Sequence, residues 1–527
     1  MLLRNTRRCT HGATQPRPGS RCGAHGSPPA EASRKGARVR NLYIDGTWTT
    51  PRRGRGREVI NPFDQSVVAK VAEGDHGDAR DAIAAARRAF DSGPWPHTPA
   101  AERGRKVFAL ADLVERDSDE LARLETLDTG KTLTESAADM GDVAAVLRYF
   151  AGLADKDDGH VVASPVPASR SIVVREPVGV CGQISPWNYP LLQASWKLAP
   201  ALAAGNTVVV KPSEITPMST IKLFELVDEV GFPAGVANLV LGPGPTVGNE
   251  LAASPDVDMI SFTGGIATGK TVMRAASANV KRIALELGGK NPNIVFADAD
   301  FDTAVDYALM AVFFHAGQVC SAGARLLLED SLHDAFVAEV CDRVSRIRLG
   351  NGLDDATESG PMISAEQRDK VERYVQIGID EGATLAVGGK RPQAAWLQAG
   401  FFFEPTVLTG CTNDMRIVQE EIFGPVLTVE RFSTESEVVE RANSTIYGLA
   451  GAVWTRDATR AERVARALRL GTVWINDYHP YFAQAEWGGF KQSGIGRELG
   501  RQGFDEYTEA KHVYSNLDPK PVKWFKG

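Results

Sequence analysis

The 527-residue chain is predicted to belong to the α/β class, with a doubly wound parallel sheet at its centre. Short apolar segments alternate with helical segments through residues 178–278, and a second alternation of the same kind starts near residue 293. Hydrophobic residues make up 43% of the chain and charged residues 24%, as in ordinary globular proteins. Strands that alternate with helices predict parallel strands joined by crossover helices. A chain of this length is too long to pack around a single hydrophobic core, so two or three domains are expected.

The first part of the fold is predicted to be mostly helical. The pattern NLYIDGTW at residues 41–48 predicts a short strand and turn. Apolar residues then recur at helical spacing, which predicts helices over residues 78–90, 101–127 and 133–154 and leaves open a break near Asp117.

The alternating pattern predicts four strands, over residues 178–184, 207–211, 237–241 and 259–262. Helices are expected between and after them, over residues 194–204, 216–230, 247–253 and 269–278, with Thr216 as the candidate N-cap of the second. A parallel sheet of this kind binds nucleotides at the carboxyl ends of its strands.

The second α/β run is expected to contain strands over residues 294–296, 325–328 and 473–476. Its predicted helices span residues 302–314, 331–347, 365–381 and 459–468. Residues 307–324 carry no charge and are about as long as a membrane span. They include His315 and Gln318, however, so we interpret them as a buried core segment that ends at an active site, and expect no membrane partner.

The net charge of -7 hides a basic N-terminal segment. Residues 1–40 hold eight Arg and one Lys against a single Glu, so the remaining chain is strongly acidic. An acidic body argues against nucleic acid as a partner. The basic segment lacks apolar periodicity and is expected to be disordered. Its Arg-rich composition fits a transit peptide, but its Pro and Gly residues favour an untranslated or non-native extension.

The six cysteines form no CxxC pair. Cys9 and Cys22 lie in the basic segment, and the other four (Cys181, Cys320, Cys341 and Cys411) are far apart. This usage predicts a reducing compartment, and hence a cytoplasmic location, without a disulfide framework. The spacing supports no zinc site, and no metal is expected.

Three short segments carry the parts of acyl-transfer chemistry. Cys320 lies in FHAGQVCS, where small uncharged neighbours surround a candidate thiolate nucleophile. Glu286 lies in IALELGGK, and a carboxylate in apolar surroundings gains the raised pKa of a useful base. Asn188 lies between prolines in PWNYP, where its amide is a candidate oxyanion donor.

A rival interpretation comes from residues 264–271, GGIATGKT, which match the phosphate-binding pattern G-x-x-x-x-G-K-[ST]. The match follows a predicted strand and opens a predicted helix, so a P-loop phosphotransferase is a distant alternative. It would leave Cys320, Glu286 and Asn188 without a role. A helix N-terminus behind glycines also binds the pyrophosphate of a dinucleotide.

Seven motifs taken in order resemble the aldehyde dehydrogenase superfamily: PWNYP, VVVKPSE, SFTGG, LELGGKNP, GQVCSAG, EEIFGPV and GGFKQSGIGRELG. The resemblance covers about residues 41–515, and residues 477–489 are similar to bacterial betaine aldehyde dehydrogenases. It implies a Rossmann-type NAD-binding domain, an α/β catalytic domain and a β oligomerisation arm. It further implies that Cys320 attacks the aldehyde carbon, that Asn188 holds the oxyanion, that Glu286 activates water, and that Glu498 relays a proton.

The resemblance also implies NAD as cofactor. Lys211 and Glu214 would grip the adenosine ribose, and a carboxylate there would repel the 2′-phosphate of NADP. Glu421 and Phe423 would hold the nicotinamide side. The full set of implied cofactor-binding residues is Trp187, Lys211, Ser213, Glu214, Thr263, Gly264, Gly265, Gly269, Leu287, Glu421 and Phe423.

The substrate implied by the resemblance is betaine aldehyde, with an aminoaldehyde or a broader set of aldehydes as the alternative. Aromatic faces around a trimethylammonium group attract it by cation–π interaction. The implied tunnel residues are Tyr189, Trp196, Phe314, Tyr481 and Trp487. Asp139 and Asp142 match positions that attract a primary ammonium in aminoaldehyde-oxidising relatives. His315 is interpreted as structural, because Glu286 already supplies a base.

The expected division of the chain follows from the same resemblance. Residues 1–40 form the disordered basic tail, residues 41–158 and 178–288 the NAD-binding domain, and residues 289–494 the catalytic domain. Residues 159–177 form a β-hairpin that joins residues 506–518 as oligomerisation segments. Exposed strand edges need a partner, so a homodimer or homotetramer is expected.

Overall fold

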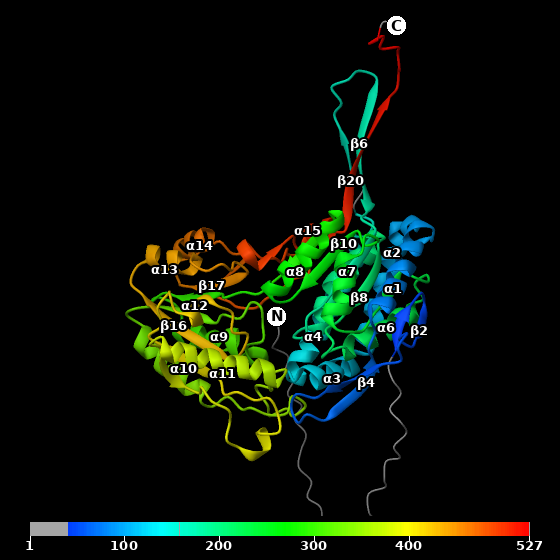
Figure 1. Cartoon of the computed structure of the whole chain (residues 1–527). Coiled ribbons are helices and arrows are strands. Elements are labelled where there is room, and N and C mark those ends of the chain that lie inside the picture. Colours follow the sequence, from blue (N-terminus) through cyan, green and yellow to red (C-terminus); the bar gives the residue numbers. More distant parts are fainter. Residues whose placement is uncertain (1–40, 157–158, 526–527) are drawn as a thin grey trace, which may run out of the picture. The chain divides into compact units, whose positions relative to one another are not determined.

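The computed structural model describes residues 41–156 and 159–525 (Figure 1). The basic segment that the sequence predicts to be disordered, residues 1–40, lies outside the described residues. Among the described residues, no helix combines the length and the apolarity needed to cross a lipid bilayer.

An eight-stranded sheet forms the first half of the fold. Its strand order is β19-β11-β10-β7-β8-β9-β1-β2, and the five strands from β11 to β9 are parallel. The bounds are β1 (Leu42–Ile44), β2 (Thr47–Thr49), β7 (Val180–Ile184), β8 (Thr207–Lys211), β9 (Ala237–Leu239), β10 (Met259–Thr263), β11 (Arg282–Glu286) and β19 (Gly494–Ile495). Because the chain winds from β7 in both directions, the topological switch point lies between β7 and β10, where such sheets bind ligands. The predicted doubly wound sheet is confirmed.

Helices cover both faces of this sheet (Figure 1). On one face pack α1 (His76–Asp91), α7 (Asn249–Ala253) and α8 (Ile266–Ala276). On the other pack α5 (Pro190–Ala204) and α6 (Met218–Val230). A further layer lies over them, formed by α2 (Ala100–Arg116), α3 (Ser118–Thr129) and α4 (Leu133–Leu153). Every residue of α5 is buried, since it is enclosed between the sheet and that outer layer.

The second half of the fold is a seven-stranded sheet of order β14-β15-β16-β13-β12-β17-β18, parallel except at β14. Its strands are β12 (Pro292–Val295), β13 (Arg325–Glu329), β14 (Thr384–Val387), β15 (Thr406–Thr409), β16 (Val426–Phe432), β17 (Ala450–Trp454) and β18 (Thr472–Ile475). Its helices are α9 (Phe301–Phe313), α10 (His333–Val344), α11 (Ala365–Asp380), α12 (Arg416–Gln419), α13 (Glu435–Asn443) and α14 (Ala458–Ala467). The sequence predicted three of these strands and missed β14 to β17. Strands β15, β16 and β17 are buried on both faces and lack alternation, whereas β14 is a short, exposed edge strand.

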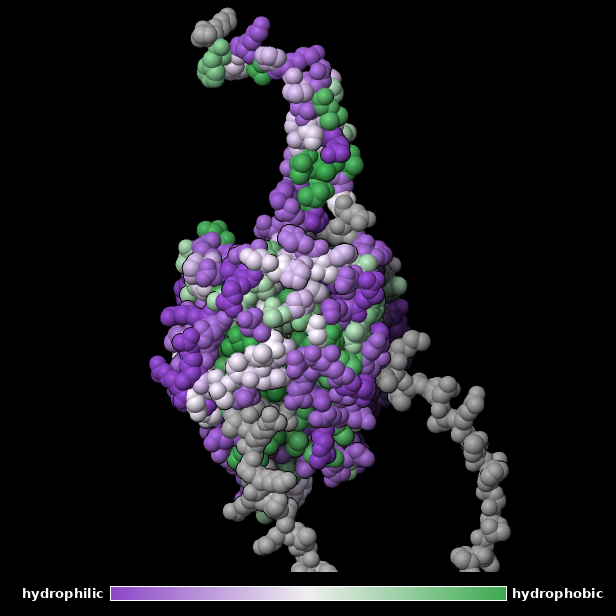
Figure 2. Space-filling view, turned by 90° about the vertical axis from the view of Figure 1, so that its right-hand side faces the viewer, coloured by the Kyte–Doolittle hydropathy of each residue, from purple (hydrophilic) through white to green (hydrophobic). Residues whose placement is uncertain are grey.

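A separate three-stranded antiparallel sheet contains β5 (His160–Val162), β6 (Ser169–Pro177) and β20 (Thr508–Asn516). The predicted hairpin is present and pairs with the chain end within one chain, whereas the predicted pairing of these strands between subunits stays a prediction. Val161 and Val513 are exposed on this sheet, and Figure 2 shows hydrophobic surface along it at the top of the view. A two-stranded sheet pairs β3 (Gly56–Ile60) with β4 (Val67–Ala72).

The structure decides two element boundaries that the sequence raised, at Asp117 and at Thr216. The break at Asp117 is real, because this residue ends α2 and precedes α3. The predicted cap at Thr216 is wrong: α6 starts at Met218, whose N–H donates to the buried carboxylate of Asp128 at 2.9 Å. The last short helix, α15 (Gly500–Asp505), leads into β20.

Candidate active site

Cys320 and Asn188 come from different halves of the fold. The Asn188 side chain contacts the loop that carries Cys320. Asn188 lies between β7 and α5, two residues before that helix begins, and Cys320 follows the turn at Phe314–Gly317 at the end of α9. The Asn188 side-chain Nδ2 donates to the carbonyl of Gln318 at 2.8 Å. One N–H of the amide is thereby engaged, and no residue in the described part of the chain accepts from the other, which can serve an oxyanion.

The Cys320 thiol is held in its neutral form. Burial raises its pKa to about 12, and the nearby carboxylates of Glu286 and Glu421 oppose ionisation as well. Its backbone carbonyl accepts from Asn291 Nδ2 at 2.9 Å. A thiol in this state attacks a carbonyl only when a neighbouring group takes its proton.

Glu286 ends β11 with its carboxyl group in a dry environment. The residue is 4% exposed, and neither carboxyl oxygen has a hydrogen-bond partner among the described residues. Burial, reinforced by the charge of Glu498, raises its pKa well above the ordinary value. Gly488 leaves room for this carboxyl, since a Cβ there would lie 2.9 Å from Oε1. A carboxyl group with raised proton affinity is suited to general-base work.

Glu498 is tied into a buried polar network that starts on α5. Lys197 Nζ forms an ion pair with its carboxylate, and Ser261 Oγ donates to Oε1 at 3.2 Å. Lys197 also donates to Thr263 Oγ1 at 2.7 Å, and Thr263 donates to Gln193 Oε1 at 3.0 Å. The sequence analysis missed Lys197. Its signal was a lone Lys in an otherwise uncharged, largely apolar helix, where a charge needs a partner.

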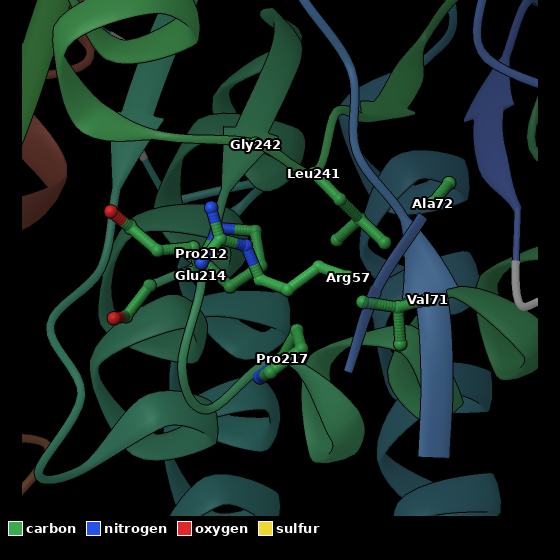
Figure 3. A pocket seen from close by; sticks show the side chains of 9 residues that line it. Arg57, Val71, Ala72, Pro212, Glu214, Pro217, Leu241 and Gly242 are labelled. Atoms are coloured by element: carbon green, nitrogen blue, oxygen red, sulfur yellow. The ribbon is translucent and has the colours of Figure 1, made fainter. Parts of the chain in front are cut away.

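The predicted adenosine side of the cofactor site lies at the end of β8. Lys211 Nζ donates to Glu214 Oε2 at 3.3 Å and to the Pro212 carbonyl at 2.8 Å. Ser213 and Glu214 line a pocket together with Arg57 of β3. Figure 3 shows the Arg57 side chain reaching toward Pro212 and Glu214.

The N-terminus of α8 suits the pyrophosphate of a dinucleotide. Gly265 is the N-cap and supplies no side-chain hydrogen bond, so the first N–H groups of the helix are available to an anion. A Cβ at Gly265 would meet no atom within 4 Å, which leaves space for the ligand. Gly269, in contrast, lets the helix approach Leu287, where a Cβ would lie 2.6 Å from Cδ2.

The P-loop alternative conflicts with this local structure. Helix α8 begins at Ile266, so three of the four residues between the motif's glycines are already helical. They form no loop that wraps phosphate oxygens with backbone N–H groups. Lys270 is exposed on the helix surface.

The predicted nicotinamide-side residues also lie close together. Glu421 Oε1 accepts from the N–H of Gly289 at 3.1 Å, next to the turn that follows Glu286. Burial raises the pKa of Glu421 to about 7. Phe423 has a left-handed φ of 61°, and its ring meets that of Trp187 edge-on with 5.2 Å between centroids.

Four of the five predicted substrate residues join one aromatic cluster. Trp487 lies 5.0 Å from Tyr481 and 6.3 Å from Trp196, measured between ring centroids. Phe314 joins through His479, at 6.1 Å. Tyr189 instead contacts His315, at 5.7 Å.

His479 is a second residue that the sequence analysis missed. Its ring is stacked with that of Tyr481, whose hydroxyl also contacts Ser321 next to Cys320. Burial lowers the pKa of His479 to about 4, so the ring is neutral near pH 7. A neutral ring at this place does not repel a cationic substrate.

The position of Asp139 argues against its expected role, which was to attract the primary ammonium group of an aminoaldehyde. Lys131 Nζ donates to Asp139 at 2.6 Å and to Glu125 at 3.0 Å, all inside the protein. The charge of Asp139 is therefore compensated by the fold itself. Asp142, one turn further along α4, is exposed. His315 is buried, as a structural histidine would be, and its pKa is lowered well below the ordinary value by that burial.

Among the described residues, no group of three or more His, Cys, Asp or Glu side chains forms a candidate metal site. The four cysteines of the described part, Cys181, Cys320, Cys341 and Cys411, are all free.

Comparison with known proteins gives one consistent result. The model of the aldehyde dehydrogenase family matches residues 48–513. Betaine aldehyde dehydrogenase of Bacillus subtilis is 67% identical over 484 residues, which are 92% of this chain and 99% of that protein. Peroxisomal aminoaldehyde dehydrogenase 2 of Pisum sativum is 43% identical, over 93% of this chain and 98% of that protein. The crystal structure of Staphylococcus aureus betaine aldehyde dehydrogenase in complex with NAD+ matches with a TM-score of 0.92 and 58% identity, over 93% of this chain and 97% of that one.

Proposed function

The chain belongs to the aldehyde dehydrogenase family, and on this premise we propose that it oxidises betaine aldehyde to glycine betaine with NAD as the hydride acceptor. One observation carries the proposal. The loop of Cys320, with Asn188 bonded to it, adjoins an aromatic cluster that contains Trp196, Tyr481 and Trp487. The first group suits attack on a carbonyl, and the second suits a quaternary ammonium group.

In the first step, Cys320 attacks the aldehyde carbon. The thiol proton goes to a base, and Glu286 is the nearby carboxyl whose raised pKa suits that role. The developing oxyanion accepts from the free N–H of Asn188 Nδ2 and from the backbone N–H of Cys320. Removal of one such donor typically costs about 10²–10³ in rate.

The hydride on the carbon attached to Cys320 would be transferred to NAD, which would supply the oxidising equivalent when bound. Lys211 and Glu214 would hold its adenosine ribose, and the exposed N-terminus of α8 its pyrophosphate. Glu421 and Phe423 would hold the nicotinamide side.

Once Glu286 has released the thiol proton toward solvent, its carboxylate accepts a proton from the water that attacks the thioester in the last step. Glu498 and Lys197 lie behind it, and the charge of Glu498 raises the pKa of Glu286. We infer that this pair passes the proton onward toward solvent. The product carboxylate then leaves Cys320 as the free thiol.

The aromatic cluster of Trp196, Tyr481 and Trp487 determines the substrate preference. A trimethylammonium group desolvated against such rings gains about 2 kcal/mol or more for each good contact. Neutral His479 adds no repulsion. The aminoaldehyde alternative loses support because Asp139 is already paired with Lys131, although exposed Asp142 remains available to it.

The deciding experiment compares NADH formation from betaine aldehyde and from 4-aminobutyraldehyde. We expect a higher kcat/KM for betaine aldehyde and no NADH formation by the Cys320→Ser variant. A preference for 4-aminobutyraldehyde would move the assignment to the aminoaldehyde class. Undiminished activity of Cys320→Ser would reject the mechanism.

We further infer the domain division and the assembly. Residues 41–158 and 178–288 contain the core of the eight-stranded sheet, and residues 289–494 contain the seven-stranded sheet. The exposed apolar residues of β5 and β20 support a homodimer or homotetramer, which the mass from light scattering tests. The free cysteines support a reducing, cytoplasmic location.

A further inference from the structure

The loop that carries Cys320 is held in an unfavourable backbone conformation. His315 has φ 46° and ψ 41°, and Ala316 has φ 50° and ψ 35°. Gly317 follows with φ 70°. Three successive residues are thus left-handed, and two of them carry a Cβ, for which this region is costly. Such a conformation persists only where the surroundings hold it.

A carboxylate from the outer helical layer holds the first of these residues. Glu135 Oε1 accepts from the backbone N–H of His315 at 2.7 Å, across 180 residues of sequence. Its Oε2 accepts from the N–H of Thr132 at 2.7 Å and from the Thr132 hydroxyl at 2.9 Å. Glu135 is only 6% exposed, so water does not replace these bonds.

The bond to His315 is connected directly to the reacting groups. The carbonyl of His315 accepts from the N–H of Gln318 at 3.0 Å. Gln318 in turn accepts from Asn188 through its carbonyl and from the N–H of Ile363 through Oε1, at 2.8 and 2.9 Å. A change at His315 therefore moves Gln318, which lies two residues before Cys320. The oxyanion donor Asn188 is bonded to this same residue.

We propose that Glu135 is a positioning residue for the reaction, which sets the conformation of the Cys320 loop through the N–H of His315. This role rests on the proposed aldehyde oxidation, and no sequence motif points to it. The role is visible in the bonds of the two carboxylate oxygens: one oxygen of Glu135 caps its own helix, and the other accepts from the Cys320 loop.

The chain contains a matched control for the capping part of this role. Asp78 occupies the same position in the capping box of α1 and is 3% exposed. Its Oδ2 accepts from the N–H of Asp75 at 2.9 Å, and its Oδ1 accepts from a distant backbone N–H, that of Arg52, also at 2.9 Å. Asp78 thus has the same burial and the same two kinds of bond, but it bonds no residue of the Cys320 loop.

The test compares Glu135→Ala, Glu135→Gln and Asp78→Ala in the full-length enzyme. We expect both alanine variants to lower Tm, and only Glu135→Ala to lower kcat, by at least tenfold, with KM for NAD within twofold of the parent. Glu135→Gln keeps an oxygen for the His315 N–H and should recover kcat to within about threefold. Hydrogen exchange of the peptide spanning residues 315–320 should accelerate in Glu135→Ala and stay unchanged in Asp78→Ala.

A kcat of Glu135→Ala within twofold of the parent would overturn the proposal, as would equal loop exchange in both alanine variants. Should Glu135→Ala fail to fold, Thr132→Val and Glu135→Asp decide the matter. Thr132→Val weakens the cap and should keep its kcat, whereas the shorter Asp side chain should lower kcat at least fivefold. The opposite pattern rejects the role. Hydrogen exchange requires no turnover, so a failure of the proposed oxidation remains distinguishable from a failure of this inference.

Discussion

Replacement of Glu498 by Gln should change both the stability and the pH dependence of the enzyme. The Lys197 and Glu498 side chains are 0% and 3% exposed, and the charges of both act on the pKa of Glu286. In Glu498→Gln the ammonium group of Lys197 keeps its bond to Thr263 Oγ1 but loses its counter-charge. Removal of one partner from a buried pair costs about 3–5 kcal/mol.

The effect on Glu286 has a definite sign. The charge of Glu498 raises the pKa of Glu286, and that of Lys197 lowers it. Glu498→Gln removes the charge that raises the pKa of Glu286 and keeps the Lys197 charge that lowers it. Glu286 should therefore ionise at a lower pH. A base that ionises earlier moves the acidic limb of the pH–rate profile to lower pH.

The assay is hydrolysis of 4-nitrophenyl acetate, an ester whose acyl group Cys320 would accept and release in the proposed mechanism without NAD. Its rate is measured as a function of pH for the parent, Glu498→Gln and the double variant Lys197→Met/Glu498→Gln, with Tm for each. The double variant leaves no uncompensated charge and should regain part of the lost Tm. An acidic limb that stays in place or moves to higher pH in Glu498→Gln would refute the reasoning, and so would an unchanged Tm.

Two other substitutions test the specificity residues. Trp487→Ala removes a ring that contacts both Trp196 and Tyr481; at about 2 kcal/mol per cation–π contact, KM for betaine aldehyde should rise about 30-fold. KM for propanal, which carries no charge, should change much less, and an equal rise for both aldehydes would contradict a cation site. Glu214→Ala should raise kcat/KM with NADP, because it removes a carboxylate while Arg57 remains in the same pocket; unchanged NADP activity would place the 2′-phosphate elsewhere.

The sequence alone predicted the elements with strong local signals. The strand at Thr207–Lys211 and the helix that begins at Leu133 were placed within a residue or two, because the first is a compact apolar run and the second has apolar residues at helical spacing. Strands β16 and β17 were missed, since their residues face packed layers on both sides and follow no alternation. The P-loop pattern at residues 264–271 could be kept only as a distant alternative, because the pattern does not state where the helix starts, and the structure places that start at Ile266.

The sequence by itself determined which side chains are available for chemistry: Cys320, Glu286 and Asn188 stand in recognisable local patterns, whose roles stay predictions until the variants are made. Only the tertiary structure decided their partners. Lys197 meets Glu498 across 301 residues, and Glu135 meets His315 across 180. Contacts at such separations depend on how the outer helices, the sheet and the catalytic loop are packed. Local propensity and spacing carry no information about that packing. Because an unpaired polar group is unfavourable when buried, each of these groups has a partner in the folded chain.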